Sequence, residues 1–253
     1  MARRDSWTIY RYESVDSTQV VAAGLIANGT PHRTVVVAER QTAGFGRKGD
    51  PWHDQPGASL LMTVIVRPHA TASVPRYAMI AALAGIAAIR AATGLAATIK
   101  WPNDVLLNER KVAGILGDAT WQGARLEALR LGIGMNISGE RETFRARGLL
   151  HASSLAAEAG RAIDRDIVFE AFLAAFARME DQSISDSGAA IVAAWRASVA
   201  TVDRRVIAVA ANGMTIAGVA RDVTEDGDLT VTTDTGGNER LRATDIRSLR
   251  HVG

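Results

Sequence analysis

The chain has 253 residues, of which 47% are hydrophobic and 22% are charged, and its formal net charge is +2. These values fit one large domain, or a large domain with a small one, and exclude a disordered or fibrous protein. The small net charge disfavours nucleic-acid binding by bulk electrostatics. The absence of cysteine excludes disulfides, thiolate nucleophiles and zinc-thiolate sites. Residues 1–7 lack the apolar stretch of a secretory signal and no segment is expected to span a bilayer, so we expect a cytoplasmic protein.

The N-terminal part predicts a short strand over residues 7–12 and a helix over residues 20–26 that ends at Asn28-Gly29. The cap of that helix comes from one of three polar residues, Asp16, Ser17 or Thr18. A helix start with hydroxyls and amides can also hold a polar ligand, so capping and binding are compatible roles.

A glycine-rich segment lies between two runs that predict strands, residues 34–39 and 58–66. It contains Gly44, Gly46, Gly49 and Gly57, with Arg47 and Lys48 among them. Glycines allow positive φ and close backbone approach, and amide N–H groups beside cations form a concavity that suits an anion. Taken alone, the same segment fits a mobile surface connection equally well.

A second polar cluster follows an alanine-rich helix expected over residues 75–93, which is apolar almost all round and should pack across a sheet. Asn108-Glu109-Arg110 predicts a tight turn, which places Asn103-Asp104 and Lys111 on either side of a hairpin. A carboxylate, an amide and a cation then meet in one place. The alternative is an ordinary surface hairpin with a solvated Lys111.

The clearest period-two pattern covers residues 127–138 and predicts a strand with one apolar face. The opposite face carries Gly132, Gly134 and Asn136, so it is nearly bare of side chains. Such a face either receives another element or lets a ligand lie against the backbone.

The C-terminal part predicts helices over residues 166–181 and 187–198, and then short strands separated by turn signals such as Asn212-Gly213. The strands are expected over residues 205–210, 214–222, 229–233 and 239–250. About 50 residues of this kind make a small β-barrel.

Five motifs, taken in chain order, resemble the motif series of a known protein family. They are Ser17-Thr18, Gln41-Thr42-Ala43-Gly44-Phe45-Gly46-Arg47-Lys48-Gly49 with Trp52, Lys100-Trp101-Pro102-Asn103-Asp104, Lys111-Val112-Ala113-Gly114-Ile115-Leu116, and Gly132-Ile133-Gly134-Met135-Asn136. The series resembles that of the biotin protein ligases over nearly the whole chain. The resemblance implies an α/β (α+β) catalytic domain over residues 1–200, with a mixed central sheet and flanking helices of the class II synthetase-like, biotin–lipoate ligase type. An SH3-like barrel over residues 201–253 follows it.

The same resemblance implies an ATP-dependent, AMP-forming ligase. Biotin and MgATP give biotinoyl-5′-AMP and pyrophosphate, and the biotinyl group then passes to a lysine of a biotin carboxyl carrier domain of a biotin-dependent carboxylase. ATP and Mg²⁺ are the implied cofactors. Neither DNA nor a membrane is an expected partner, and a homodimer is an open possibility.

The resemblance also implies roles for single residues. Lys111 would sit beside the biotin carboxylate and the phosphate, Arg47 would anchor the loop over that phosphate, and Asp104 would orient the incoming amine or a magnesium shell. The implied biotin-binding residues are Ser17, Thr18, Gln19, Gln41, Gly44, Phe45, Gly46, Arg47, Lys111 and Gly114. The implied ATP or adenylate residues are Arg47, Trp52, Asn103, Lys111 and Asn136. No residue is assigned as a direct metal ligand.

The sequence departs from the family pattern at Phe45 and Asp50, which replace arginines of the usual glycine-arginine loop. The charges between residues 45 and 54 then cancel. Either Phe45 closes over the ligand while Lys48 and Lys111 supply enough charge, or the adenylate is held less tightly. The first motif also comes too early for the N-terminal DNA-binding domain that some relatives carry, so we expect an enzyme without repressor function.

Two other functions remain open at this point. A lipoate or octanoate transferase shares the implied fold and the target lysine. A non-catalytic biotin-binding sensor is the alternative from another class, and the neutralised loop is the feature that favours it.

Overall fold

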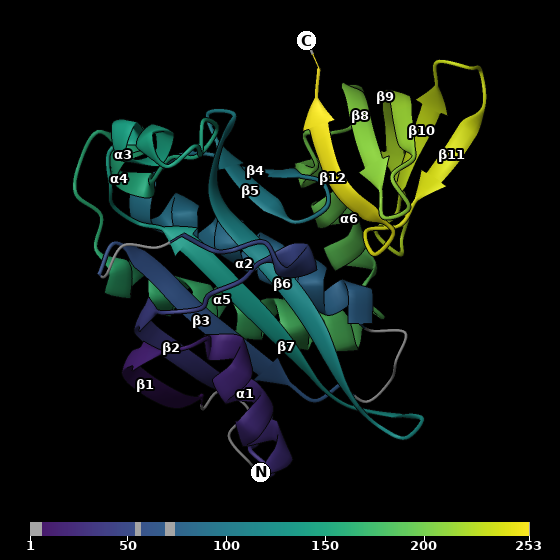
Figure 1. Ribbon diagram of the computed structural model, residues 1–253. Helices are drawn as coiled ribbons and strands as arrows, with labels where there is room; N and C mark the ends of the chain where they lie inside the picture. The colour runs from purple at the N-terminus through teal and green to yellow at the C-terminus, as the bar shows by residue number, and fades with distance from the viewer. Residues whose placement is uncertain (1–6, 54–56, 69–73, 253) are drawn as a thin grey trace.

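The computed structural model describes residues 7–53, 57–68 and 74–252, which form two sheets with flanking helices (Figure 1). The strands of the larger sheet are β1 (Thr8–Val15), β2 (Thr34–Gln41), β3 (Ser59–Val66), β4 (Thr98–Lys100), β5 (Asp104–Leu107), β6 (Arg110–Gln122) and β7 (Arg125–Asn136). Within the described ranges this sheet has seven strands in the order β1-β2-β3-β7-β6-β5-β4. β1 and β2 are parallel and the other neighbours antiparallel, so the predicted mixed sheet is confirmed.

The helices cover both faces of this sheet. One face carries α1 (Thr18–Ala27), which packs on β2, β3 and β7. The other carries α2 (Val74–Thr93), with α5 (Arg165–Ser185) and α6 (Ala189–Ser198) packed against it. Two short helices that the sequence did not reveal, α3 (Arg141–Ala146) and α4 (Leu155–Ala159), follow β7, and a 3₁₀ turn, η1 (Arg47–Gly49), lies in the glycine-rich loop.

Strand β7 explains why the two faces differ. Successive side chains of a strand point to opposite faces, and the apolar set that includes Leu131 and Ile133 is buried in the same core as α2. The bare face lies on the side of α1, where Gly132 meets Gln19 and Gly134 meets Trp52. The period-two prediction is therefore confirmed.

Helix α2 corrects one expectation about membranes. Over its 20 residues it is long and apolar enough to cross a bilayer by length and composition, although we expected no such segment. Its apolar residues have another explanation in the structure, because most of them are buried against the sheet and against α5. The N-terminal segment invoked against a secretory signal lies mostly outside the described residues.

The smaller sheet contains β8 (Arg205–Ala210), β9 (Thr215–Val223), β10 (Leu229–Thr233), β11 (Asn238–Leu241) and β12 (Ile246–His251). These strands are antiparallel, in the order β11-β10-β9-β8-β12, and the sheet curves on itself at the C-terminal end of the chain (Figure 1). The strand expected over residues 239–250 is wrong as a single element. The Asp245 N–H donates to the Arg242 carbonyl at 3.0 Å and closes a turn that divides it into β11 and β12.

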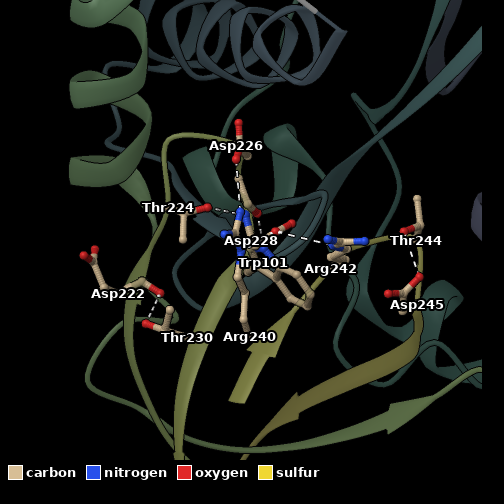
Figure 2. A network of polar contacts seen from close by, with 11 residues as sticks. Trp101, Asp222, Thr224, Asp226, Asp228, Thr230, Arg240, Arg242, Thr244 and Asp245 are labelled. Atoms are coloured by element: carbon tan, nitrogen blue, oxygen red, sulfur yellow. Dashed lines mark hydrogen bonds and ion pairs between the residues drawn. The ribbon is translucent and has the colours of Figure 1, made fainter. Parts of the chain in front are cut away.

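Trp101 joins the two sheets. Its side chain is buried, its backbone N–H donates to Thr201 Oγ1 at 3.0 Å, and its indole Nε1 donates to the Gly227 carbonyl at 2.9 Å. Figure 2 shows this indole beneath the turn between β9 and β10, where Arg240 pairs with Asp226 and Asp228. A single hydrophobic core contains residues of both sheets, so the smaller sheet is packed against the larger one.

His251 makes the stability of this contact between the two sheets depend on pH. Its Nε2 lies 3.0 Å from Thr201 Oγ1. Burial, and then the positive charges of Lys100 and Arg204, lower the pKa of His251 to about 4, compared with about 6.5 in an unfolded chain. Between these two values the unfolded chain binds a proton that the folded chain does not, so stability decreases as the pH falls from about 6.5 to about 4.

We therefore expect the melting temperature to fall between pH 7 and pH 5, and to fall less in His251→Gln. Thermal unfolding followed by circular dichroism at each pH measures both slopes. His151→Gln, at an exposed position, is the control and should keep the wild-type slope. Equal slopes for His251→Gln and the wild type would contradict the assignment.

Candidate active site

A cavity of about 250 Å³ opens on the α1 face of the larger sheet. Its floor is made by β6 and β7, its sides by the start of α1 and the loop over residues 45–52, and its remaining wall by the segments 100–104 and 247–249. Four of the five motifs in the sequence reach this cavity with most of their residues, and the smaller sheet contributes to it.

The floor is bare because three glycines lie where side chains would otherwise stand. A Cβ on Gly134 would lie 2.5 Å from the ring of Trp52, and one on Gly132 would lie 2.6 Å from Gln19 Nε2. At Gly114 the distance to the Trp52 ring would be 3.2 Å. The indole and the amide therefore rest directly on the backbone, which no residue other than glycine allows at Gly132 or Gly134 without displacing them.

One end of the cavity is a fixed polar cluster at the start of α1. Ser17 caps this helix, as one of the predicted candidates, by accepting from the Gln19 N–H at 3.2 Å. The Thr18 N–H and hydroxyl both donate to Gln41 Oε1, at 2.8 and 3.0 Å, and Thr63 Oγ1 donates to Thr18 Oγ1 at 2.9 Å. These bonds hold the polar groups in one orientation.

Gly44 and Asn136 support the cavity but are not among the described residues that line it. A Cβ on Gly44 would lie 2.7 Å from Gln41 Nε2, so this glycine makes room for the glutamine that does line the cavity. Asn136 is buried and its Nδ2 donates to the Ser153 carbonyl at 2.9 Å, which ties β7 to the segment before α4. The predicted direct contacts of Gly44 with biotin and of Asn136 with the nucleotide therefore gain no support from this geometry.

Two side-chain atoms at the cavity have no hydrogen-bond partner in the described part of the chain. They are Gln19 Oε1, an acceptor, and Trp52 Nε1, a donor, and both are buried. The other amide atom of Gln19 is satisfied, since Nε2 donates to the Leu116 carbonyl at 3.2 Å. A buried polar atom without a partner costs free energy. A ligand that supplies one donor and one acceptor would remove this cost.

The charged end of the cavity is the predicted hairpin. β5 and β6 pair across Asn108 and Glu109, which both have positive φ, and the hairpin brings Lys111 Nζ to 2.6 Å from Asp104 Oδ1. The Lys111 N–H is held by the His151 carbonyl at 2.8 Å, and its Nζ lies 5.7 Å from the centroid of the Trp52 ring. Lys111 is thus paired inside the cavity, which argues against the solvated surface lysine of the alternative.

Asn103 lines the same end of the cavity, and its Nδ2 donates to the Ile115 carbonyl at 3.1 Å.

The glycine-rich loop closes on itself above the cavity. The Gly46 N–H donates to the Asp50 carbonyl at 2.7 Å, and the Trp52 N–H donates to the Gly44 carbonyl at 2.9 Å. Phe45 and Gly46 line the cavity, and 39% of Phe45 remains exposed. These backbone bonds give the described part of the loop a defined shape above the cavity.

The loop cations bind the smaller sheet rather than the cavity. The Arg47 guanidinium donates to the carbonyls of Ala243 and Ile246, the latter at 2.8 Å, and Lys48 Nζ donates to the Thr244 carbonyl at 2.5 Å. Burial is the main cause that lowers the pKa of Arg47. Arg47 still lines the cavity, but its guanidinium is committed to carbonyls of the turn between β11 and β12. Lys48 does not line the described cavity, so the expected supply of charge from Lys48 gains no support from this geometry.

Sequence reasoning missed the contribution of β12. Residues 247–249 line the cavity, together with Met62 of β3 and Asp50 of the loop. No local pattern connects β12 with motifs so distant in the chain. β12 lies beside the cavity because the two sheets pack together at Trp101, and only the tertiary structure shows this packing.

The contact between Gly134 and Trp52 predicts the effect of one methyl group. In Gly134→Ala the new Cβ overlaps the indole, and such overpacking costs about 1–3 kcal/mol of stability. Urea unfolding measures the loss. Gly117→Ala on β6 is the control, because its Cβ would be at an ordinary 3.8 Å from Leu131. A Gly134→Ala variant as stable as the control would contradict this account of the floor.

Comparisons with known proteins place this chain in a family. The model of the biotin/lipoate A/B protein ligase family matches residues 12–136. The biotin--[acetyl-CoA-carboxylase] ligase of Paracoccus denitrificans is 36% identical over 76% of this chain and 81% of its own. The bifunctional ligase/repressor BirA of Bacillus spizizenii is 33% identical over 88% of this chain and 68% of its own.

A solved structure supports the same fold. The biotin protein ligase from Aquifex aeolicus, in complex with biotin and ATP, superimposes with a TM-score of 0.82 at 24% identity and covers 97% of this chain and 99% of its own. The likeness spans both sheets, so the α/β architecture with its C-terminal β domain is shared. With its motifs, its cavity and its relatives taken together, the chain belongs to the biotin/lipoate A/B protein ligase family, and within it to the biotin protein ligases.

Proposed function

We propose that this protein is an ATP-dependent ligase that activates biotin as biotinoyl-5′-AMP and transfers the biotinyl group to a lysine of a biotin carboxyl carrier domain. One observation carries the proposal. A polar side chain and a charged side chain lie over positions of the bare floor that are two residues apart on β7. Gln19 stands over Gly132, and Lys111 stands over Gly114, whose strand partner is Gly134.

This arrangement fits a small ligand with a polar head and a carboxylate tail. The ureido ring of biotin has N–H donors and a carbonyl acceptor, which match the unpaired acceptor on Gln19 and the hydroxyls of Ser17 and Thr18. Its apolar part would lie on the glycine floor beside Trp52. The carboxylate would then reach the Lys111 end of the cavity.

Lys111 acts on the first chemical step. An oxygen of the biotin carboxylate attacks the α-phosphorus of ATP, the bond to pyrophosphate breaks, and a mixed anhydride forms. Both reactants are anions, so the barrier is lowered by positive charge and alignment. Lys111 supplies a cation there, and its contacts with Asp104 and Trp52 hold the ammonium group in place.

Asp104 acts on the second step. The amine of the carrier lysine attacks the acyl carbon, the bond to AMP breaks, and the amine loses a proton. A carboxylate at the cavity attracts a cationic side chain, and Asp104 is exposed enough to receive one because its side chain retains 22% of its accessible surface. We therefore assign Asp104 to orienting Lys111 first and the incoming amine second.

Magnesium fits this site as a companion of ATP. In the described ranges, no group of three or more His, Asp or Glu side chains could hold a metal by itself. Asp50 and Asp104 line the cavity, and one or two carboxylates with substrate phosphates are the usual ligands of Mg²⁺. When bound, the ion supplies charge neutralisation on the phosphates. ATP would bring it to the site.

The first experiment is biotin-dependent exchange of labelled pyrophosphate into ATP. We expect exchange in the wild type, and a loss of at least about 100-fold in Lys111→Met, because a charge placed at the reacting groups is worth several kcal/mol. Calorimetry on the same samples tests biotin binding. Binding without exchange in the wild type would favour the sensor, and exchange that requires lipoate would favour the transferase of the lipoate branch.

A second experiment tests the neutralised loop. Phe45→Arg with Asp50→Arg restores two cations at the cavity, and each charge-assisted contact is worth about 1.5–3 kcal/mol. We expect slower release of biotinoyl-5′-AMP, measured by rapid filtration. The control, Phe45→Leu with Asp50→Asn, removes the ring and the carboxylate without adding a cation. A release rate that the double arginine leaves unchanged would contradict the prediction.

The acceptor and the compartment complete the proposal. We propose the carrier domain of a biotin-dependent carboxylase as acceptor, because a relative that is 36% identical is a biotin--[acetyl-CoA-carboxylase] ligase. A cytoplasmic location is part of the same proposal.

A further inference from the structure

A buried carboxylate joins several segments of the chain close to the charged end of the cavity. The side chain of Glu158, in α4, is 0% exposed. Its Oε1 accepts from Ser153 Oγ at 2.5 Å and from Arg141 Nε at 3.0 Å. Its Oε2 accepts from Asn108 Nδ2 at 2.9 Å. Glu158 therefore ties α4 to the start of α3, to the segment before α4 and to the tip of the β5–β6 hairpin, which lie side by side (Figure 1).

These bonds keep the carboxylate of Glu158 charged. Burial acts to raise its pKa, but hydrogen bonds from Ser153, Asn108 and Arg141 and the charge of the guanidinium outweigh burial, so the pKa of Glu158 lies below its usual value. A buried charge is stable only while its partners stay in place, because the loss of one partner leaves the charge unpaired. The three donors are therefore held in fixed positions around Glu158.

Two of these donors hold the backbone of Lys111. Asn108 lies in the turn just before Lys111, where its φ is 47°. The Ser153 N–H donates to the Lys111 carbonyl at 2.9 Å, and the Lys111 N–H donates to the His151 carbonyl at 2.8 Å. One carboxylate thus fixes both the turn that precedes Lys111 and the segment that lies beside it.

We propose that Glu158 is a positioning residue, which acts through Lys111 and sets where its ammonium group meets the biotin carboxylate and the α-phosphate. Asp104 holds the end of the Lys111 side chain, whereas Glu158 holds the backbone from which that side chain extends. Glu158 is not one of the described residues that line the cavity, so its effect is indirect. The inference rests on the proposed function, since it requires the role assigned to Lys111.

A small displacement of Lys111 is sufficient to slow the reaction. A cation lowers the barrier only where it is held in advance at the position of the reacting groups, and a displacement of about 1 Å can cost about 100-fold in rate. Binding of the ureido end of biotin does not depend on this position, because Ser17, Thr18 and Gln19 lie at the other end of the cavity.

The test uses two variants of the full chain in biotin-dependent ATP–pyrophosphate exchange. Glu158→Gln keeps the shape of the side chain, but it is neutral and has a single acceptor atom for the three donors. Asn108→Gly removes one donor at an exposed position where glycine accepts the positive φ. Glu109→Gly is the matched control, because Glu109 is the next residue of the turn, also has positive φ, and pairs with Arg204 instead of Glu158.

We expect kcat to fall about tenfold or more in Glu158→Gln, because Lys111 is displaced, and by a smaller factor in Asn108→Gly. The KM for biotin should stay at the wild-type value in both variants, and Glu109→Gly should keep wild-type kinetics. Added to Lys111→Met, Glu158→Gln should cause no further loss of kcat, because residues that act as a unit have non-additive effects.

A wild-type kcat in Glu158→Gln would overturn the inference. So would a loss confined to the KM for ATP, which would assign Glu158 to the nucleotide, or a loss that multiplies with that of Lys111→Met, which would show that Glu158 acts independently of the lysine. If Glu158→Gln does not fold, a wild-type kcat in Asn108→Gly overturns the inference. In each case exchange by the wild type leaves the proposed function standing. A wild-type protein without biotin-dependent exchange would instead overturn the proposed function, and the inference with it.

Discussion

The site depends on the bare backbone of two neighbouring strands. Gly132 and Gly134 of β7, with Gly114 of β6, let an amide and an indole lie directly on the sheet. The strand can give up side chains on this face because four apolar residues on its other face, Leu129, Leu131, Ile133 and Met135, are buried in the core that includes α2. One face of β7 therefore stabilises the fold, and the other leaves room for a ligand.

The smaller sheet is held against this site by unusually specific polar contacts. The Trp101 indole bonds the turn between β9 and β10, and Arg47 bonds the turn between β11 and β12. Both residues belong to motifs that the resemblance assigns to ligand binding. The structure shows that such residues also join the sheets, so their substitution would affect binding and domain packing together.

The contacts of Arg47 with the smaller sheet limit the positive charge that the loop offers to a ligand. The loop has few cations, and the two at its tip are occupied by carbonyl groups. The positive charge that remains free at the cavity comes from Lys100 and from β12. The electrostatic balance of the site is thus shared between segments that lie far apart in the chain.

Local chemistry made much of the fold predictable. The alternation over residues 127–138 indicated β7 and its two faces, and the polar residues 16–18 indicated the start of α1, which Ser17 caps. The turn at Asn108 and Glu109 indicated the hairpin that pairs Lys111 with Asp104. The turn over residues 242–245 was missed because it contains neither glycine nor proline, and β11 and β12 therefore looked like one strand.

The sequence by itself determined the local elements that carry most of the polar and charged groups of the cavity, because periodicity, capping and turn preferences act over a few residues. Tertiary structure decided which partner each group has. Arg47 bonds a carbonyl 196 positions away, Asn136 turns to Ser153, and a bulge in β12 brings Arg247 to the cavity. These pairings arise when two sheets dock, and docking depends on the summed packing of distant surfaces that no local pattern records.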